Sequence, residues 1–463
     1  MTTAQAKAVS LSRLASFWEG SGSVDRALLE DTRAAFAGVR PSQCEEAAGL
    51  IEAVLARAGS ASAREPARRA LFALLDTVRR RSFTQALRPA EVEGWTRLLL
   101  PVVEGADHTF GELLRSREET DPKVVAMRVL GAEASEVTVA DLARRTRAIA
   151  RGLYALLPRE EEARVAILSE NSIEAALCDI ACLANGIIDF PLPANATSEQ
   201  VTYMLRHSGA RVLLASDDEQ VEKVLPSLAA LPDLKEVVVF SGACADRHGL
   251  LSLEQMVGQV SGAFDDADRA ARAARVRSRD LATVMYTSGT TGRPKGICFN
   301  HLNIVSKRLC RGFALPQLNE GDVFLCYLPL YHTFGRFLEM TGSLWWGATY
   351  TFARSTAHAS LVEDFRQVRP TVFISVPKKW MELQETAARE APAGDAEAAA
   401  GQLRALTGGR LRFGLSAAGY LDPVVFRAFH RAGVELCSGY GMTEATGGIT
   451  MTPPGEYVDG SIG

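Results

Sequence analysis

The sequence predicts an α/β protein in which parallel-rich sheets are layered with helices, preceded by an all-α region. Two observations carry this prediction. From Thr109 onward, short apolar runs typical of buried strands alternate with helical segments, which is the order that parallel sheets covered by helices require. Before that point the chain is rich in Ala, Arg, Leu and Glu and has few strand-like runs. We therefore expect a helical region over residues 1–104 and an α/β core over residues 105–463.

Length and composition limit the classes of protein to which the chain can belong. A chain of 463 residues is too long for one hydrophobic core, which favours two or more domains. The hydrophobic content of 47% and the net charge of -4 are typical of a globular protein without a nucleic-acid partner. No signal-peptide segment and no uncharged apolar run of membrane-spanning length occurs, so we expect a cytoplasmic protein. Peripheral contact with a membrane and the oligomeric state stay open.

The eight cysteines contain no C-x-x-C pair, and several lie in apolar runs such as ALCDIACL. We expect reduced core residues of an intracellular protein rather than zinc ligands.

The helical region shows apolar residues at helical spacing in two stretches. They are Ala47, Leu50, Ile51, Val54 and Leu55 in the first, and Leu71, Leu74, Leu75 and Val78 in the second. The region contains no cluster of catalytic side chains. We interpret it as a packing or partner-binding module.

The elements of the α/β core follow in order. Thr138 with Asp141 predicts a capped helix that runs to Leu156, and Thr197 with Gln200 predicts a second helix start. A further helix is expected over residues 173–183. Predicted buried strands cover residues 164–168, 187–190, 211–215, 236–240 and 281–285. The low-complexity stretch 391–402 is expected to be an exposed, mobile connection.

A loop rich in glycine and hydroxyl side chains follows the last of these strands. Residues 286–296 are YTSGTTGRPKG, and they differ from the P-loop because Lys295 follows Pro294 and Gly296 stands where the magnesium-binding hydroxyl belongs. A plain linker is the alternative. Glycines, hydroxyls and a lysine together favour contact with a polyphosphate. The candidate residues are Thr287, Ser288, Gly289, Thr290, Thr291, Gly292 and Lys295.

Two more predicted strands end in small or aromatic residues. Residues 410–415 lead into Ser416, Ala417 and Ala418, where a flat ring could lie on the backbone, although close helix–strand packing is the alternative. Residues 434–437 lead into a segment whose candidates are Gly439, Tyr440, Gly441, Met442, Thr443 and Glu444. Ligands of open α/β sheets gather at the carboxyl ends of strands, so these segments are candidate binding positions.

A carboxylate beside a hydroxyl suits Mg²⁺ and a phosphate oxygen, which makes Glu444 the candidate metal ligand and Thr443 its neighbour. A Thr-Glu pair is also common at a helix start. Taken alone, His332 in LPLYHTF is more typical of a structural histidine than of a site residue. The aromatic residues near it could line a pocket or fill the core.

Three motifs carry a family resemblance. YTSGTTGRPKG, GYGMTE and YLPLYHTFGRF resemble the signature segments of the adenylate-forming superfamily, which includes acyl-CoA synthetases, luciferases and adenylation domains. The resemblance extends from Thr109 to Gly463. A fourth segment, TVFISVPKKWMEL, is similar to a segment of long-chain fatty acyl-CoA synthetases.

The resemblance implies the large N-terminal domain of such an enzyme and assigns the candidate residues. The glycine-rich loop and Thr443 would contact the phosphates of ATP, and Tyr440 would cover the adenine. Glu444 would hold Mg²⁺, and His332 would stand between the nucleotide and the acyl pocket.

The implied reaction activates a carboxylic acid, expected to be a medium- or long-chain fatty acid, to acyl-AMP and then forms a thioester with coenzyme A. A ligase that loads a carrier protein, a fragment of a carboxylic acid reductase, and a non-catalytic module that binds ATP or acyl-adenylate remain alternatives. No segment resembling the family's small C-terminal domain, which carries a catalytic lysine, follows GYGMTE. We therefore expect low activity from this chain alone.

Overall fold

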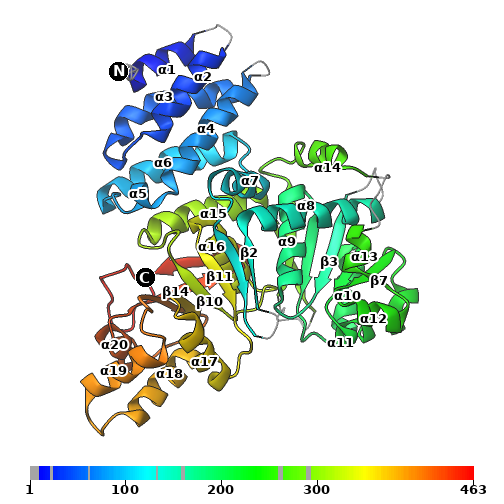
Figure 1. The fold of residues 1–463 in the computed structure, drawn as a ribbon. Helices are drawn as coiled ribbons and strands as arrows, with labels where there is room; N and C mark the ends of the chain where they lie inside the picture. Colours follow the sequence, from blue (N-terminus) through cyan, green and yellow to red (C-terminus); the bar gives the residue numbers. More distant parts are fainter. Residues whose placement is uncertain are drawn as a thin grey trace, which may run out of the picture. The chain divides into compact units, whose positions relative to one another are not determined.

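A computed structural model describes residues 10–20, 24–60, 63–131, 134–157, 162–258, 264–287 and 293–463 (Figure 1). The chain divides into two compact units. The first combines Met1–Ser116 with Arg277–Asp280 and Asn300–Asn319, and the second contains the remainder. We call them the helical unit and the sheet unit.

The helical unit is built from amphipathic helices whose apolar faces are buried. The apolar residues of both predicted helical stretches lie on two of these helices, and all of them except the half-buried Leu55 are buried. The Nε1 atom of Trp95 donates to the Pro41 carbonyl oxygen at 2.8 Å, so this buried indole has the partner it requires. The helices are α1 (Leu11–Glu19), α2 (Arg26–Ala37), η1 (Pro41–Gln43), α3 (Cys44–Ala58), α4 (Arg64–Val78), α5 (Arg81–Thr84), α6 (Pro89–Gly105) and α15 (His301–Ala314), while α7 (Phe110–Thr120) crosses the boundary to the sheet unit.

The sheet unit contains one eight-stranded and one seven-stranded sheet. In the larger sheet the inner strands are parallel, and β2 and β15 at its two edges are antiparallel to their neighbours. Its order is β15 (Gly447–Met451), β14 (Glu435–Met442), β13 (Phe413–Ala417), β12 (Val372–Ser375), β10 (Val323–Cys326), β11 (Thr349–Phe352), β1 (Val125–Val129) and β2 (Ser135–Thr138).

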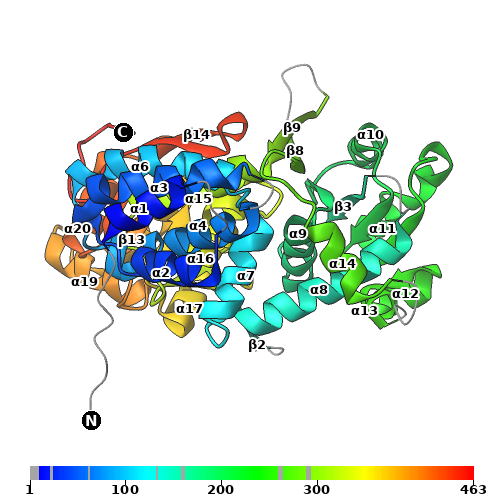
Figure 2. The ribbon, with the colours of Figure 1, turned by 90° about the horizontal axis from the view of Figure 1, so that it is seen from above.

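The smaller sheet is parallel from β7 to β8, and β9 forms its edge beside β8 (Figure 2). Its order is β7 (Leu251–Ser252), β6 (Glu236–Val239), β5 (Val212–Ala215), β3 (Arg164–Leu168), β4 (Ile188–Leu192), β8 (Leu281–Thr287) and β9 (Lys295–Asn300). The strands β3, β4 and β5 are buried almost throughout, as expected for a parallel sheet covered on both faces. The predicted α/β class is therefore confirmed.

Helices connect the strands of both sheets. The two helix starts predicted from capping residues are confirmed: Thr138 Oγ1 accepts from the Asp141 N–H at 3.1 Å, and Thr197 and Gln200 form a reciprocal capping box. The helices of the sheet unit are α8 (Val139–Leu156), α9 (Ile173–Asn185), α10 (Ser198–Ser208), α11 (Asp218–Glu222), η2 (Leu225–Ala230), α12 (Gly242–His248), α13 (Leu253–Gly258), α14 (Asp266–Ala273), η3 (Phe334–Met340), α16 (Thr341–Trp346), α17 (His358–Val368), α18 (Pro377–Glu390), α19 (Ala396–Leu406), α20 (Pro423–Arg431) and η4 (Thr443–Ala445).

The structure corrects the prediction of a mobile connection over residues 391–402. Residues from Ala396 onward belong to helix α19, whose Asp395 cap accepts from the Glu397 and Ala398 N–H groups. Alanine has the highest helix propensity, and Ala400 and Leu403 are buried. A low-complexity composition therefore concealed an ordinary packed helix.

The predicted strand limits near the site are also corrected. Ser416 and Ala417 are the last residues of β13 rather than a following loop, and β14 continues through Met442. The longer β14 arises because β15 pairs with it antiparallel from Gly439 to Met442. In the part of the chain that the structure describes, we find no helix with the length and apolar character of a membrane span.

Candidate active site

Two adjacent parallel strands bring the nucleotide-binding candidates together. In the register of β13 and β14, Ser416 lies opposite Ser438 and Ala417 opposite Gly439. The Ser416 side chain is 1% exposed, and its Oγ atom has no hydrogen-bond partner among the described residues. Tyr440, in contrast, is 48% exposed. The carboxyl ends of these strands thus combine a buried polar atom that lacks a partner with an accessible aromatic ring, which is what a planar polar ligand requires.

The backbone after Tyr440 is folded tightly. A Cβ atom at Gly441 would lie 2.5 Å from the Gly447 carbonyl oxygen, so only glycine permits this approach of β14 and β15. The turn between the two strands carries Thr443 and Glu444 in η4. The Glu444 side chain is exposed, and no hydrogen bond or ion pair involving it occurs within the described parts of the chain. It therefore offers a free carboxylate at the edge of the candidate site.

The segment with His332 lies between β10 and η3 and is fixed at both ends. The Asn171 side chain, in the loop between β3 and α9, donates from Nδ2 to the Leu328 carbonyl at 2.7 Å and accepts from the Leu330 N–H at 2.9 Å. A Cβ atom at Gly335 would lie 2.5 Å from the Leu328 carbonyl oxygen, so η3 packs directly on the same backbone. Asn171 therefore joins the smaller sheet to the His332 segment.

His332 itself is accessible at the surface. Its Nδ1 atom accepts from the Phe334 N–H at 3.3 Å, and desolvation lowers the pKa of the imidazole. Both effects favour the neutral form at pH 7. A Cβ atom at Gly447 would lie 3.9 Å from the Thr333 Cβ, so the His332 segment and the start of β15 are neighbours. The structure thus brings His332 close to the turn that carries Thr443 and Glu444.

A buried arginine joins the His332 segment to the smaller sheet. Arg336, in η3, donates from Nε and Nη2 to the two carboxylate oxygens of Asp179 on α9, at 2.8 and 2.7 Å. Its Nη2 atom also lies 2.7 Å from Asp189 Oδ2 on β4, and its Nη1 atom donates to Thr283 Oγ1 on β8 at 2.7 Å. All four side chains are buried. We call them the Arg336 cluster.

One guanidinium in this cluster faces two buried carboxylates. Burial raises the pKa of Asp189 to about 7, a rise that the positive charge of Arg336 opposes and the neighbouring Asp179 reinforces. The Oδ1 atom of Asp189 has no partner among the described residues. The cluster can therefore hold a proton on Asp189 around neutral pH.

Two of the phosphate-loop candidates, Thr287 and Lys295, lie on the last two strands of the smaller sheet. Thr287 is the last residue of β8, and Lys295 is the first residue of β9 with an exposed side chain. No hydrogen bond or ion pair joins Lys295 to the GYGMTE segment among the residues described. The remaining candidates, Ser288, Gly289, Thr290, Thr291 and Gly292, lie outside the described residues. Thr283, which accepts a hydrogen bond from Arg336, lies on β8 four residues before Thr287, so the Arg336 cluster contacts the strand that leads into this loop.

Sequence reasoning missed the residues that position the site. Asp179, Asp189 and Arg336 each occur inside an apolar run, and a charged residue in such a run is a signal of a buried ion pair. Of the aromatic residues near His332, Phe337, Trp345 and Trp346 are buried, whereas Tyr331 and Phe334 are half-buried. Phe337 packs edge-on against Phe299, with ring centroids 5.3 Å apart, and both are buried.

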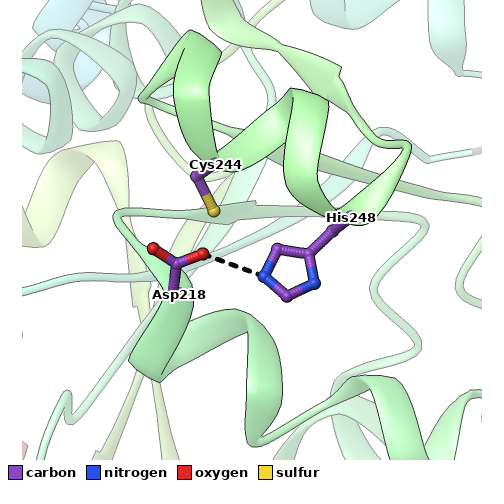
Figure 3. A group of neighbouring side chains, drawn as sticks. All are labelled: Asp218, Cys244 and His248. Atoms are coloured by element: carbon purple, nitrogen blue, oxygen red, sulfur yellow. Dashed lines mark hydrogen bonds and ion pairs between the residues drawn. The ribbon is translucent and has the colours of Figure 1, made fainter.

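A second cluster of candidate metal ligands lies away from these segments. The ligand atoms of Asp218, Cys244 and His248, on α11 and α12, lie within 4.8 Å of one another (Figure 3). Asp218 Oδ1 lies 2.9 Å from His248 Nε2, and the carboxylate also accepts from Nε and Nη2 of Arg247. The hydrogen bond from Arg247 is the main reason why the pKa of Asp218 falls below its usual range. We interpret this group as an ion-pair network that joins the two helices.

Comparisons with known proteins agree with the motif resemblance. A family model described as AMP-binding enzyme matches residues 114–463. Long-chain-fatty-acid–CoA ligase FadD15 of Mycobacterium tuberculosis is 28% identical over 400 residues, which cover 78% of this chain and 65% of that protein. Human long-chain-fatty-acid–CoA ligase 1 is 28% identical over 348 residues, which cover 65% of this chain and 48% of that protein. The chain thus spans about half to two thirds of the length of these curated relatives.

Solved structures show the same fold. A benzoate CoA ligase from Burkholderia xenovorans superposes with a TM-score of 0.62 at 22% identity, covering 77% of this chain and 65% of that one. An inhibitor-bound N-terminal domain of FACL13 from Mycobacterium tuberculosis superposes with a TM-score of 0.61 at 20% identity, covering 77% and 81%.

Replacing Arg336 with methionine should destabilise the sheet unit strongly. The variant Arg336→Met leaves two buried carboxylates without their counter-charge, and breaking a buried ion pair in this way costs about 3–5 kcal/mol. Urea unfolding at pH 7 measures the loss. The matched variant Arg144→Met removes an exposed arginine of α8 that pairs with Asp141 and should change stability little. Equal unfolding midpoints for the two variants would contradict the role given to the Arg336 cluster.

The variant Asp189→Asn should change how stability depends on pH. Between the ordinary pKa of 3.8 and the folded value of about 7, the folded protein keeps a proton on Asp189 that the unfolded chain releases. This residue therefore makes the unfolding free energy fall as pH rises from about 4 to about 7. Asparagine cannot titrate, so urea unfolding across this range should show a smaller fall, whereas the exposed control Asp246→Asn should keep the wild-type slope. An unchanged slope in Asp189→Asn would refute the raised pKa.

Proposed function

This chain belongs to the AMP-binding enzyme family, and from that membership we propose that its protein activates a medium- or long-chain fatty acid with ATP and transfers the acyl group to coenzyme A. We assign this chemistry to residues 105–463. The motif resemblance and the names of the relatives that match most of this chain point to the same reaction class.

The proposed reaction has two displacement steps. A carboxylate oxygen of the acid attacks the α-phosphorus of ATP, an O–P bond forms, and pyrophosphate leaves. The sulfur of coenzyme A then attacks the acyl carbon of the acyl-AMP, the thiol proton is released, and AMP leaves. Such transfers depend mainly on positioning and on stabilising charge, so the protein need not form a covalent bond with the substrate.

The paired ends of β13 and β14 carry the proposal. We infer that the adenine lies along Ser416, Ala417 and Ala418, with the buried Ser416 Oγ as a polar contact and Tyr440 against the ring. Strand β13 ends at Ala417, and Ala418 has a φ of 67°, in the left-handed region that a strand does not adopt. We further infer that Gly439, Gly441 and Met442 contact the nucleotide through the backbone of β14.

The phosphates would lie between the loop after β8 and the turn after β14. We assign Thr287, Lys295 and the loop residues 288–292 to the phosphates, with Thr443 on the α-phosphate. The free, exposed carboxylate of Glu444 fits Mg²⁺, a cation that prefers oxygen ligands and often takes only one or two carboxylates. When bound, Mg²⁺ would offset the negative charge of the phosphates. Neutral His332 beside this turn would border the acyl entrance.

The proposal also names the carboxylic acid substrate and the thiol that accepts the acyl group. Relatives named long-chain-fatty-acid–CoA ligases match most of this chain, and SVPKKW at the start of α18 resembles a segment of such enzymes. These likenesses support a fatty acid and coenzyme A rather than a carrier protein.

Exchange of radiolabelled pyrophosphate into ATP tests the proposal. The exchange should depend on a fatty acid, and laurate or palmitate should support it better than acetate or benzoate. Lys295→Ala should reduce the exchange rate by about 10²–10³-fold, because loss of one preorganised charge-stabilising group typically costs that much. Lys235→Ala, which removes an exposed lysine elsewhere in the sheet unit, should leave it unchanged.

Two further measurements test the assigned Mg²⁺ ligand and the thiol acceptor separately. Glu444→Gln removes the charge but keeps the size, so it should raise the magnesium concentration needed for half-maximal exchange. Coenzyme A should release AMP from the acyl-adenylate faster than an acyl carrier protein does. No binding of a non-hydrolysable acyl-sulfamoyl adenosine, measured calorimetrically, together with no acid-dependent exchange would refute the function.

A further inference from the structure

We propose that helix α15 carries a binding site for a doubly charged phosphate or sulfate group, built from Lys307, Arg308 and Arg311. The three residues belong to the helical unit, and none of them is among the residues assigned to ATP. In this unit α15 packs against α6.

The three cations share one side of α15, because residues three and four apart are neighbours on a helix. Arg308 is 2% exposed and Arg311 is 9% exposed, while Lys307 is half-buried. The Nε and Nη1 atoms of Arg308 have no hydrogen-bond partner in the described parts of the chain. A guanidinium this deeply buried normally has every donor engaged.

Among the residues that the structure describes, no acidic side chain forms an ion pair with Lys307, Arg308 or Arg311. Burial, together with the smaller effect of the neighbouring Arg311, lowers the pKa of Arg308 to about 9. The same two causes, burial first, lower the pKa of Lys307. Arg336 shows the contrast, because its burial is compensated by Asp179 and Asp189 and its pKa is raised.

The missing partner is therefore an anion from outside these residues. A single carboxylate would neutralise only one of the three charges. A tetrahedral dianion presents several acceptor oxygens, which suit the planar donor fork of arginine and the point charge of lysine. Inorganic phosphate or sulfate and the phosphate group of an ester share this chemistry.

Binding to the purified protein tests the site, with ionic strength held constant by sodium chloride. Equilibrium dialysis and thermal unfolding are measured with inorganic phosphate and, separately, with glycerol 3-phosphate. We expect saturable binding and a higher unfolding temperature in the wild type and in Lys295→Ala, which lacks the lysine assigned to ATP. Stronger binding of one probe identifies the free ion or the ester as the source.

The variant Arg308→Gln should lower the affinity by about tenfold or more. Without phosphate it should be at least as stable as the wild type, because it removes an uncompensated buried charge. Arg311→Gln gives the same test if Arg308→Gln does not fold, and Arg33→Gln, an exposed arginine of α2, is the matched control.

Three outcomes would overturn the proposal. They are the absence of saturable binding in Lys295→Ala, an unchanged affinity in Arg308→Gln or Arg311→Gln, and a clear loss of stability in Arg308→Gln without phosphate. The last result would mean that the guanidinium already has an internal partner.

Discussion

The candidate active site depends on one buried arginine. Arg336 contacts Asp179, Asp189 and Thr283, which belong to a helix and two strands of the smaller sheet, while Arg336 itself lies in the π-helix that follows the His332 segment. Buried ion pairs contribute little net stability compared with apolar packing, but they tolerate few geometries. The cluster therefore fixes where η3 lies on the smaller sheet.

This constraint connects segments that are far apart in the chain. Thr283 lies on the strand that leads into the phosphate-loop candidates, and His332 lies four residues before Arg336. Asn171 holds the backbone of Leu328 and Leu330, so a second contact from the smaller sheet fixes the other end of the His332 segment. Thr333 in turn neighbours Gly447 of the larger sheet. The His332 segment is thus held by the Arg336 cluster, by the hydrogen bonds of Asn171 and by close backbone packing.

Local signals in the sequence predicted local structure well. The capping residues Thr138 and Thr197 act within one helical turn, and both helix starts are confirmed. The fold class followed from the alternation of short apolar runs with helical segments and from the helical composition before Thr109. The length of β14 could not be predicted because it depends on pairing with β15. The low-complexity composition of residues 391–402 indicated a loop, although Asp395 is a residue that caps helices and here begins α19. The motifs and the family resemblance they carry indicated the candidate site residues, whose assigned roles stay predictions. The Arg336 cluster joins residues 157 and 147 positions apart, which no local pattern reveals.

Amide hydrogen exchange measures the coupling most directly. Exchange is compared between wild type and Arg336→Met, with Arg144→Met as the control, at residues 281–287 of β8 and residues 333–338. If the cluster ties the His332 segment to the stem of the phosphate loop, both segments should exchange faster in Arg336→Met and keep their wild-type rates in Arg144→Met. Faster exchange in residues 333–338 alone, with β8 unchanged, would contradict the account.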